Sequence, residues 1–331
     1  MQNHIKVLIF LVVTSLVGFY SCSNDFELTE SGADIPIVYG MVSVGDTATY
    51  IRVERAFIDE KTSAFVLSKD PAQLYYNDIT VKIRHLKTGK DYILNRVDGN
   101  LEGFKRDTGV FADAPNYLYK IKKNELNFIP KDEYKFIVNK SDGVILTEAT
   151  TKAITPYVNE DITTPGPTAL LSFVNNLDFK VRWFGDANAV IHDVKLVFNV
   201  KEEREGKFTD KAVTWTLAKN IDKTEYATKG RAFYEFMQGA FEKNNAIKRY
   251  FQNASLVIVS GGQEVKDYIS IGQANLGITS SGEIPVYTNL SNGGQGIFSS
   301  KTTFTRKDIA LSNATLDSLR NGVITKSLNF K

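Results

Sequence analysis

The fold class is decided by the stretch TATYIRVERAF, residues 47–57. Within it, Tyr50, Arg52 and Glu54 alternate with Ile51, Val53 and Arg55. Alternation with a period of two predicts a β-strand that turns one face to a core and the other to solvent. The protein is therefore expected to consist of β-sheets that each have one buried face and one solvent-exposed face.

Similar short patterns lie on both sides of this strand, separated by turn residues such as Thr88-Gly89 and Asp142-Gly143. They cover Ile35–Ser43, Ile79–Leu86, Asp91–Leu94, Tyr117–Tyr119, Tyr134–Val138 and Val144–Thr151. Many short strands with frequent turns predict a mainly β fold, and we expect an immunoglobulin-like β-sandwich over residues 35–153. Asp70 before Pro71 also predicts a short helix, because Asp caps helices and proline fits the first helical position.

Two readings of Tyr134 remain open. It begins an apolar strand that ends at Ser141-Asp142-Gly143, which is the setting of the tyrosine corner in immunoglobulin-like domains. The alternative is an ordinary aromatic residue on a strand face.

Residues 154–167 contain Pro156, Pro165, Gly166 and Pro167, and such a stretch predicts a linker between domains. Residues 168–331 are then a second, β-rich domain. Its stretch FKVRWFGDANAVIHDVKL, residues 179–196, is similar to the part of fibronectin type III domains in which a buried Trp precedes a turn. We therefore expect a fibronectin III-like domain with Trp183 in its core.

The hydrophobic period changes within this second domain. Residues 231–251 carry apolar side chains at helical spacing, which predicts an inserted amphipathic helix packed on the core, or two helices with a break near Asn244-Asn245. The pattern favours strands again at Ser255–Ser260 and Val265–Ile271. A short helix capped by Asn313 is expected near the C-terminal end.

Composition and charge exclude several classes of protein. The chain has 331 residues and a formal net charge of +2, so it lacks the basic excess of a nucleic-acid-binding protein. One cysteine and three histidines are too few for a disulfide framework or a cysteine-based zinc site.

The N-terminal 21 residues are typical of a bacterial lipoprotein signal peptide. Val7–Tyr20 is an apolar run too short to span a bilayer easily, and Ser21 precedes Cys22, the only cysteine of the chain. A small residue before a unique cysteine predicts cleavage and acylation at Cys22. Residues 22–34 would then be a tether, and the lipid bilayer a partner through the acyl chains. The alternative is a short N-terminal anchor helix with an incidental cysteine.

The sequence gives little sign of catalysis. His85 and His192 are expected at the surface or at strand ends, and no metal-ligand spacing, nucleophile elbow or phosphate loop is present. The glycines of Gly293–Gly296 are expected to form a turn or bulge with positive φ. The protein is thus predicted not to be an enzyme and to need no cofactor, although a pair of distant carboxylates stays open.

Tyrosines are frequent and give weak candidates for ligand contact. Tyr75, Tyr76, Tyr117 and Tyr119 occur in two close pairs, which would suit a surface on which sugars or peptides stack. The alternative is that these rings pack in the core or on strand faces.

Several motifs, taken in order, resemble one family. They are Cys22 followed by Asp25–Leu28, the strand pairs Ile37–Gly40 and Tyr50–Val53, the end of the first domain at Tyr134–Val138, Gly143 and Ala149–Thr151, and Asn289–Phe298. Together they are similar to uncharacterised Bacteroidetes outer-membrane lipoproteins, a domain of unknown function often encoded beside TonB-dependent receptors. Residues 202–251 depart from that pattern. The family has no agreed catalytic residues to carry over.

The resemblance implies a location and a role. Asp25 and Glu27 are similar to the surface-export signal of such lipoproteins, which implies an outer-membrane protein facing the exterior, with a periplasmic orientation as the alternative. It also implies a non-enzymatic accessory or ligand-binding partner of a TonB-dependent transporter. Tandem β-domains suit an adhesin or a fimbria-associated structural lipoprotein equally well.

Overall fold

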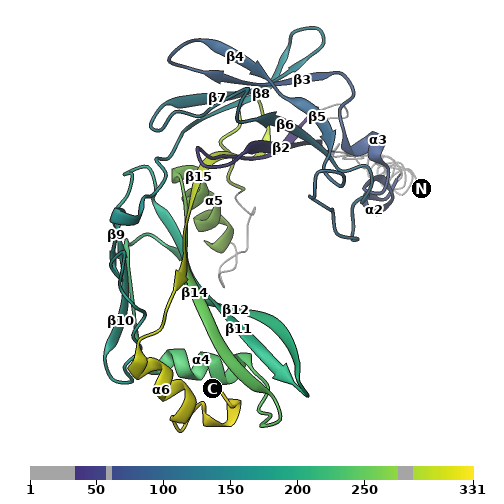
Figure 1. The fold of residues 1–331 in the computed structure, drawn as a ribbon. Helices are drawn as coiled ribbons and strands as arrows, with labels where there is room; N and C mark the ends of the chain where they lie inside the picture. The colour runs from purple at the N-terminus through teal and green to yellow at the C-terminus, as the bar shows by residue number, and fades with distance from the viewer. Residues whose placement is uncertain (1–33, 57–61, 275–285) are drawn as a thin grey trace, which may run out of the picture.

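The computed structural model describes residues 34–56, 62–274 and 286–331, and within these ranges the fold is mainly β, as predicted. The strands form three sheets, of eight, four and three strands. The eight-stranded sheet runs through the whole molecule and contributes one layer to each of two sandwiches (Figure 1).

The first sandwich is immunoglobulin-like and pairs one end of the eight-stranded sheet with the four-stranded sheet. The end of the large sheet has the order β15-β1-β2-β6-β5, and the facing sheet has the order β4-β3-β7-β8. The bounds are β1 Pro36–Val42, β2 Ala48–Arg55, β3 Ile79–His85, β4 Lys90–Ile93, β5 Asn95–Asp98, β6 Tyr117–Lys122, β7 Glu133–Lys140, β8 Ile145–Lys152 and β15 Gln295–Ile309. Two short helices, α2 (Ala64–Leu67) and α3 (Pro71–Leu74), lie between β2 and β3.

The alternation in β2 places its side chains as predicted. Ile51 and Val53 are buried in the core of the first sandwich, where they join Ile83 and Phe136 of the facing sheet. Tyr50, Arg52 and Glu54 alternate with these residues and lie on the opposite, outer face of the large sheet. The Asp70 carboxylate accepts the Ala72 N–H at the start of α3, so the predicted cap is also confirmed.

Tyr134 forms the tyrosine corner. It lies at the start of β7, is fully buried, and its hydroxyl oxygen accepts a hydrogen bond from the Ile129 backbone N–H at 2.8 Å. The bond joins the strand to the chain five residues upstream, which is the geometry of the corner in immunoglobulin-like domains.

Replacing Tyr134 by Phe is expected to lower the free energy of unfolding by about 1–2 kcal/mol, because the Ile129 N–H would lose its partner away from water. Chemical denaturation followed by circular dichroism measures this loss. Tyr92→Phe is the matched control, since Tyr92 packs on the same core and no hydrogen bond of its hydroxyl occurs among the described residues. Equal losses in the two variants would contradict the role of the corner.

The second sandwich faces four long strands with a three-stranded sheet. The long strands are β12, β11, β14 and β15, and the small sheet has the order β13-β10-β9. The bounds are β9 Ile162–Thr164, β10 Asp178–Trp183, β11 Ile191–Arg204, β12 Lys207–Ile221, β13 Glu225–Lys229 and β14 Lys248–Gly261, with helices η1 Asn159–Asp161, α4 Arg231–Ala240, α5 Gln263–Ala274, α6 Asn313–Asn321 and η2 Lys326–Leu328. Trp183 is fully buried in this core, as predicted.

Strand β15 belongs to both sandwiches. Its first half pairs in parallel with β1, where Gly296 lies opposite Val38, and its second half pairs antiparallel with β14. Phe298 lies in the core of the first sandwich and Phe304 in the core of the second. The predicted division at residues 154–167 therefore leaves the start of β15 in the first sandwich, although the sequence placed it in the second domain.

The linker is held to this strand by Arg306. The guanidinium of this buried residue donates to the carbonyl oxygens of Pro165 at 2.8 Å, Gly166 at 3.0 Å and Asn159 at 3.1 Å. Burial lowers the pKa of Arg306, while Glu160 opposes that change. The proline-rich segment is thus packed onto β15 rather than free between the domains.

Three sequence predictions for the second domain are wrong in detail. The inserted helix ends at Ala240, and residues 248–251 begin strand β14. Val265–Ile271, predicted as a strand, lies in helix α5. Ser312, not Asn313, caps α6, because its side chain accepts the Thr315 N–H.

Candidate functional site

A groove lies on the outer face of the large sheet, on the concave side of the molecule where α5 packs (Figure 1). Its volume is about 710 Å³. We call it the inner groove and define it by Tyr39, Asp46, Tyr50, Glu102, Phe104 and Lys301. These side chains come from β1, β2, β15, the turn before β2 and the loop after β5.

The inner groove has an aromatic wall. Tyr50 and Phe104 contact each other with ring centroids 4.5 Å apart, and Phe104 is half exposed. Tyr39, also half exposed, projects from the neighbouring strand. Burial raises the pKa of Tyr39, with a further contribution from Tyr268 of α5, so its hydroxyl stays protonated and able to donate. Flat rings with polar tips are suited to contact ligands that have both apolar and polar faces.

Charged groups of both signs lie beside these rings. Glu102 accepts a hydrogen bond from the Tyr50 hydroxyl at 3.0 Å and forms an ion pair with Lys120. The hydrogen bonds from Lys120 and Tyr50 lower the pKa of Glu102, so this carboxylate is charged at neutral pH. Asp46 and Lys301 form a looser pair at 3.4 Å. The groove thus offers donors and acceptors within reach of an aromatic surface.

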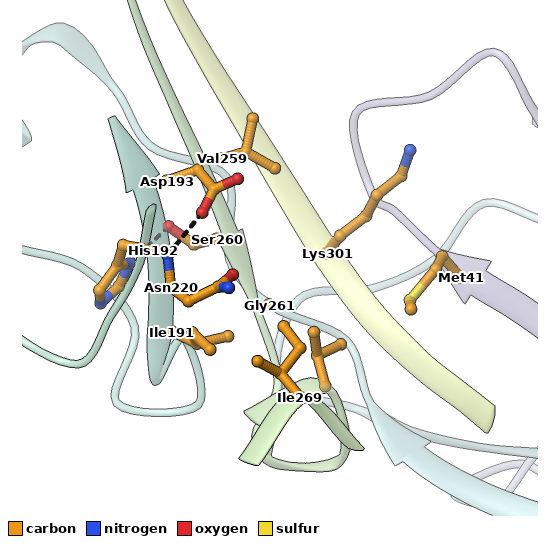
Figure 2. Close-up of a pocket in the computed structure, with 11 residues that line it drawn as sticks. Met41, Ile191, His192, Asp193, Asn220, Val259, Ser260, Gly261, Ile269 and Lys301 are labelled. Carbon is orange, nitrogen blue, oxygen red and sulfur yellow. Dashed lines mark hydrogen bonds between the residues drawn. The ribbon is translucent and has the colours of Figure 1, made fainter. Parts of the chain in front are cut away.

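A smaller, mostly apolar cavity adjoins the groove where the two sandwiches meet. This junction pocket has a volume of about 190 Å³ and shares Met41 and Lys301 with the inner groove. Its apolar lining is Met41, Ile191, Val259, Val265 and Ile269. Figure 2 shows Met41 and Lys301 on one side of the pocket and Ile191 and Asp193 on the other.

His192 lines the junction pocket and is the second residue of β11, so it lies at a strand end as one of the two expectations had it, but it is not at the surface. It is buried on the core side of β11, edge to face with Trp183. Its Nδ1 lies 2.7 Å from the Ser260 hydroxyl (Figure 2). The Ser260 hydroxyl also lies 2.9 Å from the Tyr157 hydroxyl. Burial lowers the pKa of His192 to about 4, with a small opposing contribution from Asp222, so the ring is neutral at pH 7.

His85 is the last residue of β3, at a strand end as one of the two expectations had it, but it is buried rather than exposed at the surface. Its Nε2 lies 2.9 Å from Asp132, its Nδ1 lies 3.1 Å from the Thr88 hydroxyl, and its ring stacks on Tyr134. The neighbouring charges of Arg84 and Lys87 suggested an exposed position. His85 instead lies two residues after Ile83 on the face of β3 that points to the core. Hydrogen bonds to both ring nitrogens make that burial tolerable.

The four candidate tyrosines do not form an exposed stacking surface, and the alternative of packing in the core or on strand faces is the one observed. Tyr75, Tyr76 and Tyr119 are buried, and Tyr117 is half-buried against Tyr75 with the Arg96 guanidinium 3.9 Å from its ring. The sequence missed the exposed rings of the inner groove. The signal was present at Tyr50, because the alternation in β2 already placed it on the wet face.

The proposed anchor residues lie elsewhere in the chain. Cys22, Asp25 and Glu27 are outside the described residues. Among residues 34–56, 62–274 and 286–331, no three His, Cys, Asp or Glu side chains are close enough together to hold a metal ion. No helix within these same ranges combines the length and apolar character needed to cross a bilayer.

No known family matches the chain, and no curated protein is similar to it in sequence. Solved structures similar in fold include a cytokine receptor complex, at 8% identity and a TM-score of 0.25, covering 84% of this chain and 99% of that one. The FN1–FN3 domains of chicken CNTN1 match at 9% identity and a TM-score of 0.18, over 83% of this chain and 65% of that one. A third match is the C-terminal globular domain of an oligosaccharyltransferase from Pyrococcus abyssi, at 7% identity and a TM-score of 0.19, over 85% of this chain and 45% of that one. Similarities this distant carry no conclusion about function.

Proposed function

We propose that the protein is a non-enzymatic, lipid-anchored outer-membrane protein that binds a ligand in the inner groove and serves as the accessory partner of a TonB-dependent transporter. The observation that carries the ligand-binding part is the groove itself, with Tyr39, Tyr50 and Phe104 beside Glu102 and Lys301. Its volume of about 710 Å³ falls in the range of sites that hold small ligands.

The chemistry of the groove favours an oligosaccharide. Sugar rings have apolar C–H faces that stack on aromatic rings, and hydroxyl edges that both donate and accept hydrogen bonds. Glu102 supplies an acceptor, while Lys301 and the protonated hydroxyl of Tyr39 supply donors. A short peptide is the competing ligand.

The anchoring part is supported by the sequence alone. An apolar run over Val7–Tyr20, a small residue at 21 and the unique Cys22 favour acylation, and the resemblance to lipoproteins encoded beside TonB-dependent receptors favours the transporter partner. Asp25 and Glu27 favour export to the outer surface.

Truncation of the aromatic wall tests the ligand. In calorimetric titrations with a panel of neutral oligosaccharides, Tyr39→Ala is expected to weaken binding about tenfold, since a lost aromatic contact is worth about 1.4 kcal/mol. Phe208→Ala is the matched control, because Phe208 is an exposed aromatic of β12 outside the groove. Binding of peptides but no sugar, or equal effects of the two variants, would overturn the assignment.

Cellular fractionation tests the anchor. Cys22→Ala is expected to release the protein from the membrane fraction, because each acyl chain contributes about 0.8 kcal/mol per buried methylene. Asp25→Ala with Glu27→Ala is expected to keep the protein in membranes and to lower its accessibility to added protease. The anchoring proposal would be wrong if the Cys22→Ala protein still fractionated with membranes and if globomycin had no effect on that fractionation.

Affinity capture of the tagged protein from outer membranes in mild detergent tests the partner. A TonB-dependent receptor recovered in stoichiometric amount is the expected result. Recovery with fimbrial subunits would instead favour an adhesin or a structural lipoprotein.

A further inference from the structure

An apolar surface lies at one end of the first sandwich, separate from the inner groove. It is formed by Phe65 and Val66 of α2 together with Val110 and Phe111, and we call these four residues the apolar tip. Phe65 is 71% exposed and Val66 is 62% exposed, and Val110 and Phe111 are each about half exposed. Adjacent large apolar side chains left in water usually mark a surface that contacts a partner or a membrane.

The backbone of the apolar tip is tied to the body of the protein. Ser68 is buried, its hydroxyl donates to the Val110 carbonyl at 2.7 Å, and its own carbonyl accepts the Ala112 N–H at 2.8 Å. Lys69 Nζ donates to the Phe111 carbonyl at 3.2 Å. The two segments therefore form one platform that presents its apolar side chains to solvent.

The described chain begins at the same end of the sandwich. The Ile35 carbonyl accepts the Ala56 N–H at 2.9 Å, and Pro36 pairs with Arg55, so the start of β1 lies beside the end of β2. Helix α2 follows β2 within a few residues and lies with α3 at the end of the first sandwich that is far from the second (Figure 1). Eleven residues lie between Cys22 and Asp34, so the chain between these two positions reaches at most about 40 Å.

We propose that the apolar tip rests on the bilayer that holds Cys22, with its side chains at the boundary between headgroups and acyl chains. This inference rests on the proposed lipid anchor, which confines the tip to the neighbourhood of the membrane. Two attachment points, the acyl chains and the tip, fix the orientation of the molecule, whereas a single flexible tether leaves it free to rotate.

The attraction is apolar rather than electrostatic. Among the described sequence neighbours of the apolar tip, Lys69, Lys105 and Arg106 are matched in number by Asp70, Asp107 and Asp113. Contact with the bilayer is therefore independent of anionic lipid and of salt. A partner protein on the same surface is the competing occupant.

The test uses the chain from residue 22 onward, coupled through Cys22 to a maleimide lipid in phosphatidylcholine vesicles. Cys22 is the only cysteine, so this coupling supplies the anchor whether or not cells acylate it. A negative result would therefore mean that the apolar tip does not contact the bilayer, and it would say nothing against acylation of Cys22 in cells. Phe65→Trp reports on the tip, and Val323→Trp, at an 86% exposed position beyond α6, is the matched control.

With brominated lipids, Phe65→Trp is expected to lose roughly half of its added fluorescence, because interfacial side chains enter about 5–10 Å into the bilayer. Val323→Trp should keep its fluorescence. Adding Val66→Glu and Phe111→Glu to Phe65→Trp should abolish the quenching, and 0.5 M salt, roughly fivefold above the usual ionic strength, should not. An unquenched Phe65→Trp on the tethered protein would overturn the proposal and favour a protein partner.

Discussion

Gly296→Ala is expected to lower the free energy of unfolding by about 4 kcal/mol, from backbone strain and overpacking together. Gly296 has φ of +102°, a conformation that residues with a side chain rarely adopt. A Cβ at this position would lie 2.1 Å from the Val38 carbonyl oxygen, which is backbone and has little room to move. Urea unfolding followed by circular dichroism measures the loss.

The local consequence falls on the pairing of β1 with β15. Gly296 lies opposite Val38 in the parallel register, so the added methyl group separates the strands where the second half of the chain returns to the first sandwich. Faster hydrogen exchange of the β1 amides in Gly296→Ala is the expected signature.

Gly293→Ala is the control for Gly296→Ala. Gly293 also has a positive φ, of +74°, but a Cβ there would meet no atom within 4 Å. Its variant should lose only about 1 kcal/mol, the cost of the left-handed conformation. Comparable losses in the two variants would contradict the close approach of Gly296 to β1.

The stability of the protein is expected to fall by about 3 kcal/mol between pH 6.5 and pH 4 because of His192 alone. Burial lowers the pKa of His192 to about 4 in the folded protein, whereas the unfolded chain has the usual value near 6.5. Between these values the unfolded state binds the extra proton, so the stabilisation present above pH 6.5 is lost as the pH falls and is constant below pH 4. Urea titrations at several pH values measure the slope.

Two variants separate this effect from the titration of acidic groups. His192→Asn removes the titrating ring, so its stability should fall less between pH 6.5 and pH 4 than that of the unmodified protein. Ser260→Ala removes the partner of Nδ1 but leaves the ring buried, so its slope should persist at lower overall stability. A steep slope retained in His192→Asn would show that another group is responsible.

Local pattern was sufficient for some parts of the site and not for others. The alternation in β2 identified the solvent-facing side that carries Tyr50. The positive φ expected for the glycines of Gly293–Gly296 occurs at Gly293 and Gly296 but not at Gly294. The burial of His192 was missed because its partner Ser260, and Tyr157 whose hydroxyl contacts that of Ser260, are far away in sequence. A polar side chain enters a core when distant groups satisfy it, and a local pattern does not contain those groups.

Helix α5 shows the same limit. Val265 and Ile269 are two positions of one strand face and also an i, i+4 pair on one helix face, so a short apolar segment fits both structures. The segment packs against β11, β14 and β15, and this packing stabilises the helix rather than a strand. In the helix, Val265 and Ile269 line the junction pocket.

The sequence by itself determined the mainly β fold and the burial of Trp183, because each depends on a periodicity or spacing within one short segment. It left Tyr134 open between a tyrosine corner and an ordinary strand aromatic, and the hydrogen bond from the Ile129 N–H decided for the corner. Only the tertiary structure decided that β15 crosses between the sandwiches and that Tyr39, Phe104 and Lys301 line one groove. Those contacts join strands and loops from opposite ends of the chain. Their pairing depends on which apolar faces fit together, and the order of residues along one segment does not specify that fit.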